Sequence, residues 1–279
     1  MDYRSLLVHV DTSERSSRRA LVAARLAQAF NAELAGAYLV AAREVTPFTS
    51  AIMPADMVAT RLAQSGDAQA DAQARFRAAC ADASLMAVEW RAPAGDPIEA
   101  AVMHARYADL AVIGQPAPDD PQTGFASELA NAVLMRSGRP VLFVPFAAEG
   151  VAPGRTVLVA WKDARESARA LADALPLLAK AERVFVVTVA PQAAADVRET
   201  LVEKHVLAWL ERHDIEATFQ REVAPDLDAG NVLLSQAADL GADPIVMGAY
   251  SRPRLSELVL GGVTRLMLSS MTVLVLMAH

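Results

Sequence analysis

The chain lacks the features on which disulfide-rich, membrane-spanning and nucleic-acid-binding proteins depend. It has one cysteine, Cys80, in 279 residues, which excludes an internal disulfide and a multi-cysteine metal site. None of its apolar runs approaches the roughly 18 residues that cross a membrane. Its lysines and arginines are spread among acidic residues and the formal charge is −7, which argues against nucleic acid as the main partner.

The N-terminal stretch "MDYRSLLVHVDTSERSS" leads directly into an apolar run. It has neither the hydrophobic region nor the cleavage site of a signal peptide. We therefore expect a cytoplasmic protein that has no membrane partner. Cys80 lies in an alanine-rich stretch typical of a helix, where we expect an inert thiol.

Hydrophobic residues are abundant, at 53% of the chain, and they follow a pattern that occurs twice. The first copy opens with "SLLVHVDTSERSSRRAL" and the second with "RTVLVAWKDARESARAL", in each case an apolar run, a polar turn and an amphipathic segment. The copies also close alike, with "ADLAVIGQ" before "GRPVLFVPF" and with "ADPIVMGAY" before "MTVLVLMAH". Repetition of this kind indicates two copies of one domain.

Within each copy, apolar runs typical of buried strands alternate with helical patterns, and this alternation predicts a parallel sheet covered on both faces. Gly150, Pro153 and Gly154 interrupt the apolar pattern between the copies. The sequence thus predicts an α/β protein of two tandem doubly wound domains, each with a five-stranded parallel sheet, at residues 1–148 and 154–279. We expect the two domains to pair as a pseudo-dimer, and two chains could associate further as a homodimer.

A ligand of such a sheet binds where the winding reverses, at the carboxyl ends of the first and fourth strands. In the first copy this position is bordered by His9, Asp11 and Gly114. In the second copy it is bordered by the run from Ala160 to Asp163 and by Met247 and Gly248. Gly261 and Gly262 precede a helical pattern, and free amides at a helix start attract phosphate.

Both copies resemble the universal stress protein family in its tandem-domain bacterial form. The resemblance rests on "LLVHVDTSERSSRRAL", "TVLVAWKDARESARAL", "ADLAVIGQ", "SGRPVLFVP" and "VMGAYSRPRLSELVLGGVTRLMLSSMTVLVLMAH". It implies the adenine nucleotide alpha hydrolase-like fold and a regulatory role in the stress response. It also implies that the second domain binds ATP or a related adenine nucleotide, together with Mg.

ATP-binding members of the family carry the signature G-x2-G-x9-G-[ST]. Gly248 and Gly261 match its first and third glycines, whereas Ser251 replaces the second glycine and Gly262 replaces the hydroxyl residue. The residues that this resemblance and the predicted crevice assign to the nucleotide are Ala160, Trp161, Lys162, Asp163, Met247, Gly248, Ser251, Arg252, Gly261, Gly262, Val263 and Thr264.

The first domain keeps the acidic residue of the family at Asp11 but loses the glycine pair, in whose place we align Leu129 and Ala130. Asp119 and Asp120 make the preceding loop acidic, which disfavours phosphate. We therefore expect no ATP here, and the domain is structural, faces a partner or holds a different ligand.

No set of catalytic or metal-ligating residues emerges from the sequence. His9 and Asp11 share a strand face but lack a nucleophile nearby. The segment from Glu44 to Gln73 is interpreted as a long loop that covers the first crevice or packs on the other domain. Three functions remain open: regulatory nucleotide binding, action through protein contacts alone, and slow nucleotide hydrolysis.

Overall fold

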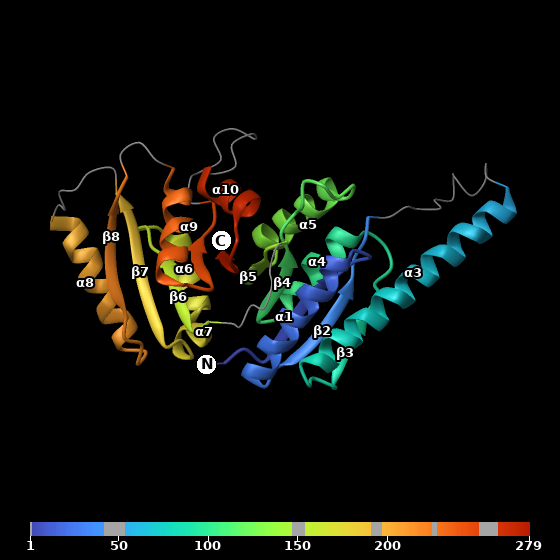
Figure 1. The fold of residues 1–279 in the computed structure, drawn as a ribbon, viewed down its shortest axis with the longest axis horizontal. Coiled ribbons are helices and arrows are strands. Elements are labelled where there is room, and N and C mark those ends of the chain that lie inside the picture. The colour runs from blue at the N-terminus through green and yellow to red at the C-terminus, as the bar shows by residue number, and fades with distance from the viewer. Residues whose placement is uncertain (1, 42–53, 147–153, 191–196, 225–227, 251–261) are drawn as a thin grey trace.

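A computed structural model of the chain describes residues 2–41, 54–146, 154–190, 197–224, 228–250 and 262–279. Its strands form one ten-stranded sheet in the order β3-β2-β1-β4-β5-β10-β9-β6-β7-β8. All neighbouring strands of this sheet run parallel except β5 and β10, which pair antiparallel. Two five-stranded parallel units therefore meet edge to edge, which confirms the predicted fold class (Figure 1).

The first unit, called the first half here, alternates strands and helices in the predicted order. Its elements are β1 (Ser5–Val10), α1 (Glu14–Phe30), β2 (Glu33–Tyr38), α3 (Ala55–Asp82), β3 (Val88–Arg91), α4 (Pro97–Arg106), β4 (Leu110–Gly114), α5 (Thr123–Arg136) and β5 (Val141–Val144).

The second half repeats this order, except that two helices, α6 and α7, stand between its first two strands. Its elements are β6 (Thr156–Ala160), α6 (Arg165–Asp173), α7 (Leu175–Ala179), β7 (Arg183–Ala190), α8 (Val197–Glu211), β8 (Thr218–Val223), α9 (Ala229–Leu240), β9 (Ile245–Gly248), α10 (Gly262–Ser270) and β10 (Val275–Ala278). No helix in the described ranges has the length and apolar character that a bilayer crossing requires.

Local signals in the sequence explain where several helices begin and end. Asp96 and Asp228 cap α4 and α9, because their carboxylates accept hydrogen bonds from amides of the first turn. Asn31 and Gly241 end α1 and α9 in the left-handed conformation, which these two residue types tolerate best. The helices thus start and stop where the chain must turn back into the sheet.

The core has two apolar layers, one on each face of the sheet. Helices α1, α3, α6, α7 and α8 cover one face, and α4, α5, α9 and α10 cover the other. Both layers continue across the junction, because Leu142 and Leu276 belong to the first layer while Phe143 and Val275 belong to the second. Burial of these β5 and β10 side chains on both faces stabilises the junction of the two halves.

Hydrogen bonds between the halves reinforce the pairing of β5 with β10. The Tyr3 hydroxyl donates to the main-chain carbonyl of Asp173 at 2.7 Å, and the Arg169 guanidinium donates to that of Gly138 at 3.1 Å. The Lys180 ammonium lies 5.1 Å from the centre of the Phe30 ring, within range of a cation–π interaction.

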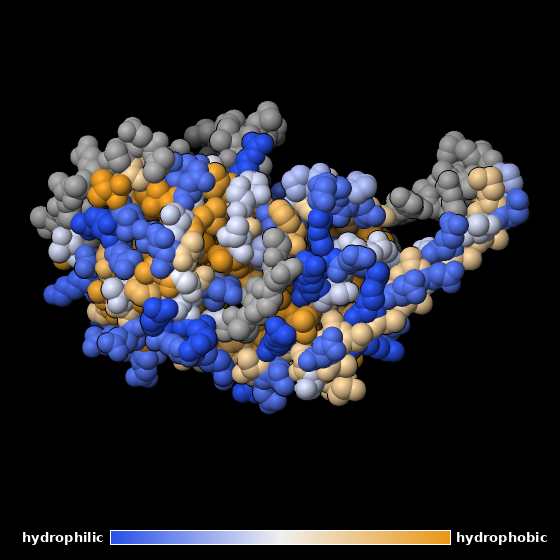
Figure 2. All heavy atoms as spheres, viewed as in Figure 1, coloured by the Kyte–Doolittle hydropathy of each residue, from blue (hydrophilic) through white to orange (hydrophobic). Residues whose placement is uncertain are grey.

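The interpretation of Glu44–Gln73 as one long loop is wrong from Ala55 onward, because α3 occupies Ala55–Asp82. Only the later part of α3 is packed, with Ala72, Phe76, Ala79 and Cys80 buried against α1, β2 and β3. Its earlier part stands clear of the body at the side away from the second half (Figure 2). The helical pattern was hidden by interspersed Gln, Ser, Asp and Gly66. Residues 42–53 lie outside the described residues.

Candidate functional site

The structure places the predicted strands side by side at the predicted position. β1 pairs with β4 through Leu6 and Leu110, and β6 pairs with β9 through Leu158 and Ile245. In each half the winding of the sheet reverses between these two strands, so their carboxyl ends are where the topology leaves room for a ligand.

In the first half, the carboxyl ends of β1 and β4 are joined by Arg19 of α1, whose side chain is only 5% exposed. Its guanidinium donates to the main-chain carbonyl of His9 at 2.6 Å and to the Asp11 carboxylate at 2.7 Å. A Cβ atom on Gly114 would collide with Nη1 of this guanidinium, so the glycine makes room for it. Arg19 thus lies in the crevice that the sequence predicted at His9, Asp11 and Gly114.

Both carboxylate oxygens of Asp11 accept hydrogen bonds from other residues of the chain. One carboxylate oxygen accepts from the Ser13 amide and hydroxyl at 2.7 and 2.5 Å, and the other accepts from Arg19. Burial alone would raise the pKa of Asp11, but the charge of Arg19, the nearby His9 and the Ser13 hydrogen bond together hold it well below its usual value. The carboxylate is therefore charged and paired internally.

His9 is buried in a neutral state. Burial and the adjacent Arg19 lower the pKa of His9 to about 4, and its Nε2 atom forms a 2.8 Å hydrogen bond with the main-chain carbonyl of Leu39. The imidazole lies 3.9 Å from Asp11, so the two side chains do converge as their shared strand face predicted. No serine, threonine or cysteine hydroxyl or thiol is hydrogen-bonded to this imidazole in the described part of the chain.

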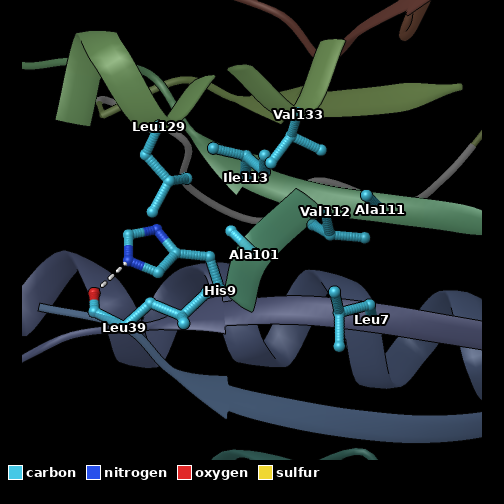
Figure 3. Close-up of a pocket in the computed structure, with 9 residues that line it drawn as sticks. All are labelled: Leu7, His9, Leu39, Ala101, Ala111, Val112, Ile113, Leu129 and Val133. Carbon is cyan, nitrogen blue, oxygen red and sulfur yellow. Dashed lines mark hydrogen bonds between the residues drawn. The ribbon is translucent and has the colours of Figure 1, made fainter. Parts of the chain in front are cut away.

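The imidazole also borders a small apolar cavity between the sheet and helices α4 and α5 (Figure 3). Its volume is about 10 Å³, which is room for no more than one water molecule. The residues that line it are Leu7, His9, Leu39, Ala101, Ala111, Val112, Ile113, Leu129 and Val133. Such a cavity is a packing defect and cannot hold a nucleotide.

In the second half, Gly248 ends β9 against the first turn of α6. A Cβ atom on Gly248 would lie 2.5 Å from the main-chain carbon of Glu166 and the main-chain nitrogen of Ser167. The glycine is therefore required by the close approach of a helix backbone. Met247, the preceding residue, is 5% exposed and belongs to the core.

The end of β6 carries the second group of predicted residues. Ala160 and Trp161 are half-buried, and Lys162 and Asp163 are exposed. Trp161 packs against the core layer of α6, α7 and α8, and its indole N–H is buried without a hydrogen-bond acceptor in the described structure. A buried donor of this kind normally has an acceptor, and none of the described residues supplies one.

Helix α10 begins at Gly262, which is exposed and beside which a Cβ atom would meet no atom of the described residues within 4 Å. Val263 is half-buried, and Thr264 is buried, with its hydroxyl oxygen accepting from the Tyr250 amide at 3.3 Å. The first turn of α10 therefore has the core on one side, and on the side of Gly262 none of the described residues contacts it. Ser251, Arg252 and Gly261 lie outside the described residues.

The structure corrects the alignment of the two halves at this helix. Gly114 and Gly248 end equivalent strands, Val141 and Val275 begin the next equivalent strands, and equal lengths of chain separate the members of each pair. Glu128, not Ala130, therefore corresponds to Gly262, and it lies within α5 because that helix begins at Thr123. The first half has a carboxylate where the second half has an exposed glycine.

Three residues that shape these positions escaped the sequence interpretation: Arg19, Glu166 and Tyr250. Arg19 had a detectable signal, because it lies three residues after Ser16 and four before Ala23 on the buried stripe of α1. Glu166 has a side chain only 8% exposed and pairs with Arg165 at 2.6 Å. The burial of Glu166 and of Tyr250 depends on how the helices pack, and no pattern in the sequence predicts it.

The model of the universal stress protein family matches residues 2–145 of the chain. The chain belongs to the universal stress protein family. This assignment agrees with the tandem α/β architecture and with a role in the stress response. No curated protein matches the chain.

Solved structures with the same architecture extend over both halves. A universal stress protein from Archaeoglobus fulgidus DSM 4304 is similar with a TM-score of 0.72 and 16% identity, over 98% of this chain and 95% of that one. A functionally unknown protein from Pseudomonas aeruginosa PAO1 is similar with a TM-score of 0.56 and 17% identity, over 99% of this chain and 92% of that one. At these identities the likeness shows the fold alone.

Proposed function

We propose that this universal stress protein is a cytoplasmic regulatory protein whose second domain, residues 154–279, binds ATP or a related adenine nucleotide. The observation that carries the proposal is the start of α10 near the carboxyl ends of β6 and β9, an exposed glycine beside which a Cβ atom would contact none of the described residues. Amides at such a helix start are not all used within the helix, and the helix dipole favours an anion there.

The contrast with the first domain, residues 1–148, supports the choice of the second. In the first domain Glu128, within α5, stands at the position of Gly262, and Arg19 lies against Gly114 and pairs with Asp11. A carboxylate at that position repels phosphate and is incompatible with the same ligand. The first domain then serves as a structural or partner-facing unit.

The remaining assignments follow from position. Ala160, Trp161, Lys162 and Asp163 would border the base and the ribose. Ser251, Gly261, Gly262 and Val263 would supply main-chain amides, and Arg252 would face the phosphates, with Mg²⁺ bound through phosphate oxygens.

Calorimetric titration with Mg-ATP tests the proposal. The variant Gly262→Glu introduces the carboxylate of the first half at a position where no described residue obstructs it, so the fold should be retained while affinity falls at least about tenfold. Gly124→Glu is the matched control, since Gly124 is an exposed glycine near the start of α5 where no described residue obstructs a side chain either. A flat titration of the wild type at millimolar Mg-ATP would reject nucleotide binding.

The second candidate is action through protein contacts, including a homodimer, without any nucleotide. The filled first-half position favours it. Purified protein that releases no material absorbing near 260 nm on denaturation, together with a flat titration, would support it. Slow hydrolysis ranks third. It requires Mg-dependent phosphate release above that of the Gly262→Glu variant, and no cluster of metal-binding carboxylates occurs in the described part of the chain.

A further inference from the structure

Tyr250, two residues beyond the end of β9, has a backbone conformation that its residue type rarely adopts. Its φ angle is +56°, in the left-handed region, and its side chain is only 9% exposed. A bulky residue in this region is strained by about 1–3 kcal/mol and is retained only where its surroundings fix it.

The contacts of Tyr250 join three elements from the two halves. Its amide donates to the Thr264 hydroxyl in the first turn of α10, and its phenol hydroxyl donates to the side-chain oxygen of Asn131 in α5 of the first half. The ring also meets His279 edge-on at 6.4 Å, and the His279 imidazole bonds to the carbonyl of Ala249. Figure 1 shows α5 and α10 on either side of the junction near the centre of the molecule.

We infer that Tyr250 couples the start of α10 to helix α5, so that ligand occupancy in the second half changes the packing of the first half. The inference rests on the proposed nucleotide site for the identity of the ligand. The output would be a change in α5, the helix of the first half that corresponds to α10.

The position of Tyr250 distinguishes it from the other hydrogen bonds between the halves. Tyr3 and Arg169 bond to Asp173, the last residue of α6, and to Gly138, which follows α5. Tyr3 and Gly138 precede β1 and β5, so these bonds lie at the amino ends of the strands, whereas Tyr250 follows the carboxyl end of β9. Tyr250 alone of these three donors also bonds to the helix at which phosphate would bind. A ligand that moves Thr264 by a fraction of an ångström acts on the Tyr250 amide and, through one rigid aromatic side chain, on Asn131. A short, fully packed path of this kind is the physical requirement for coupling.

Hydrogen exchange of the α5 amides, with and without saturating Mg-ATP, tests the coupling in the full chain. In the wild type, Mg-ATP should slow exchange in α5 about fivefold, a change of the size that one hydrogen bond contributes. Tyr250→Phe and Asn131→Ala should reduce this response to less than about twofold. Tyr3→Phe is the matched control, because it removes another buried tyrosine hydroxyl bonded across the junction, and its response should equal that of the wild type. An unchanged response in Tyr250→Phe overturns the inference.

A second measurement decides the coupling even if the wild type binds no nucleotide. Thr264→Val keeps the shape of the buried side chain and removes the acceptor of the Tyr250 amide. In the unliganded chain it should speed α5 exchange about fivefold when Tyr250 is present and not when Tyr250→Phe is already in place. Equal effects of Thr264→Val in both backgrounds overturn the coupling, whereas a flat Mg-ATP titration rejects only the nucleotide.

Discussion

Replacing Arg19 by methionine removes the charge that joins the two central strands of the first half while keeping an apolar stem of similar length. Arg19 is 5% exposed and donates to the His9 carbonyl and the Asp11 carboxylate. Methionine leaves the carbonyl without its donor and the carboxylate without its cation. We therefore expect this substitution to lower the free energy of unfolding substantially.

The magnitude follows from what Asp11 retains. Removing one partner of a buried ion pair costs about 3–5 kcal/mol when the other charge is left uncompensated. Asp11 is 20% exposed and keeps its two hydrogen bonds from Ser13, which lowers the expected cost to the bottom of that range or just below it, about 2–3 kcal/mol.

Urea denaturation at several pH values, followed by circular dichroism, is the assay, and Arg18→Met is the matched control. Arg18 is the neighbouring residue in α1 and is exposed, so its substitution should change the free energy of unfolding by no more than about 0.5 kcal/mol.

The difference between wild type and Arg19→Met should also depend on pH. Burial and Arg19 lower the pKa of His9 to about 4, so the wild type loses stability as the pH falls from about 6.5 towards 4. The depressed pKa of Asp11 adds a stabilisation that is present above about pH 4 and is lost below it. Both contributions are smaller without Arg19. The difference between the free energies of unfolding of wild type and Arg19→Met should therefore become smaller as the pH falls. Equal costs for Arg19→Met and Arg18→Met at pH 7 would refute the role assigned to Arg19.

Three further outcomes are expected. Gly248→Ala should destabilise the protein by about 1–3 kcal/mol in urea, because its methyl group would lie 2.5 Å from the backbone of α6, whereas Gly262→Ala should be nearly neutral. The imidazole of His9 should titrate near pH 4 in an NMR titration of the native protein, and a value near 6.5 would show that it is accessible to solvent. Cys80 is 1% exposed and burial raises the pKa of its thiol to about 11, so a thiol reagent at pH 8 should label it only after denaturation.

The sequence was sufficient for the architecture because strands and helices alternate with the same periods in both copies. It also located the carboxyl ends of the first and fourth strands, since topology alone fixes where the winding reverses. Residues close to a strand, such as His9, Asp11, Gly114 and Gly248, were therefore placed correctly without coordinates.

What occupies those positions was decided only by the tertiary structure. A glycine pattern does not reveal whether the space beside it holds a ligand, a guanidinium or a helix backbone, and here Gly114 accommodates Arg19 while Gly248 accommodates α6. The link from Tyr250 to Asn131 likewise joins residues more than a hundred positions apart. Local periodicity predicts how each segment folds. Which side chains from distant segments come into contact depends on how those segments pack, and the order of residues does not determine this in a way that can be read from the sequence.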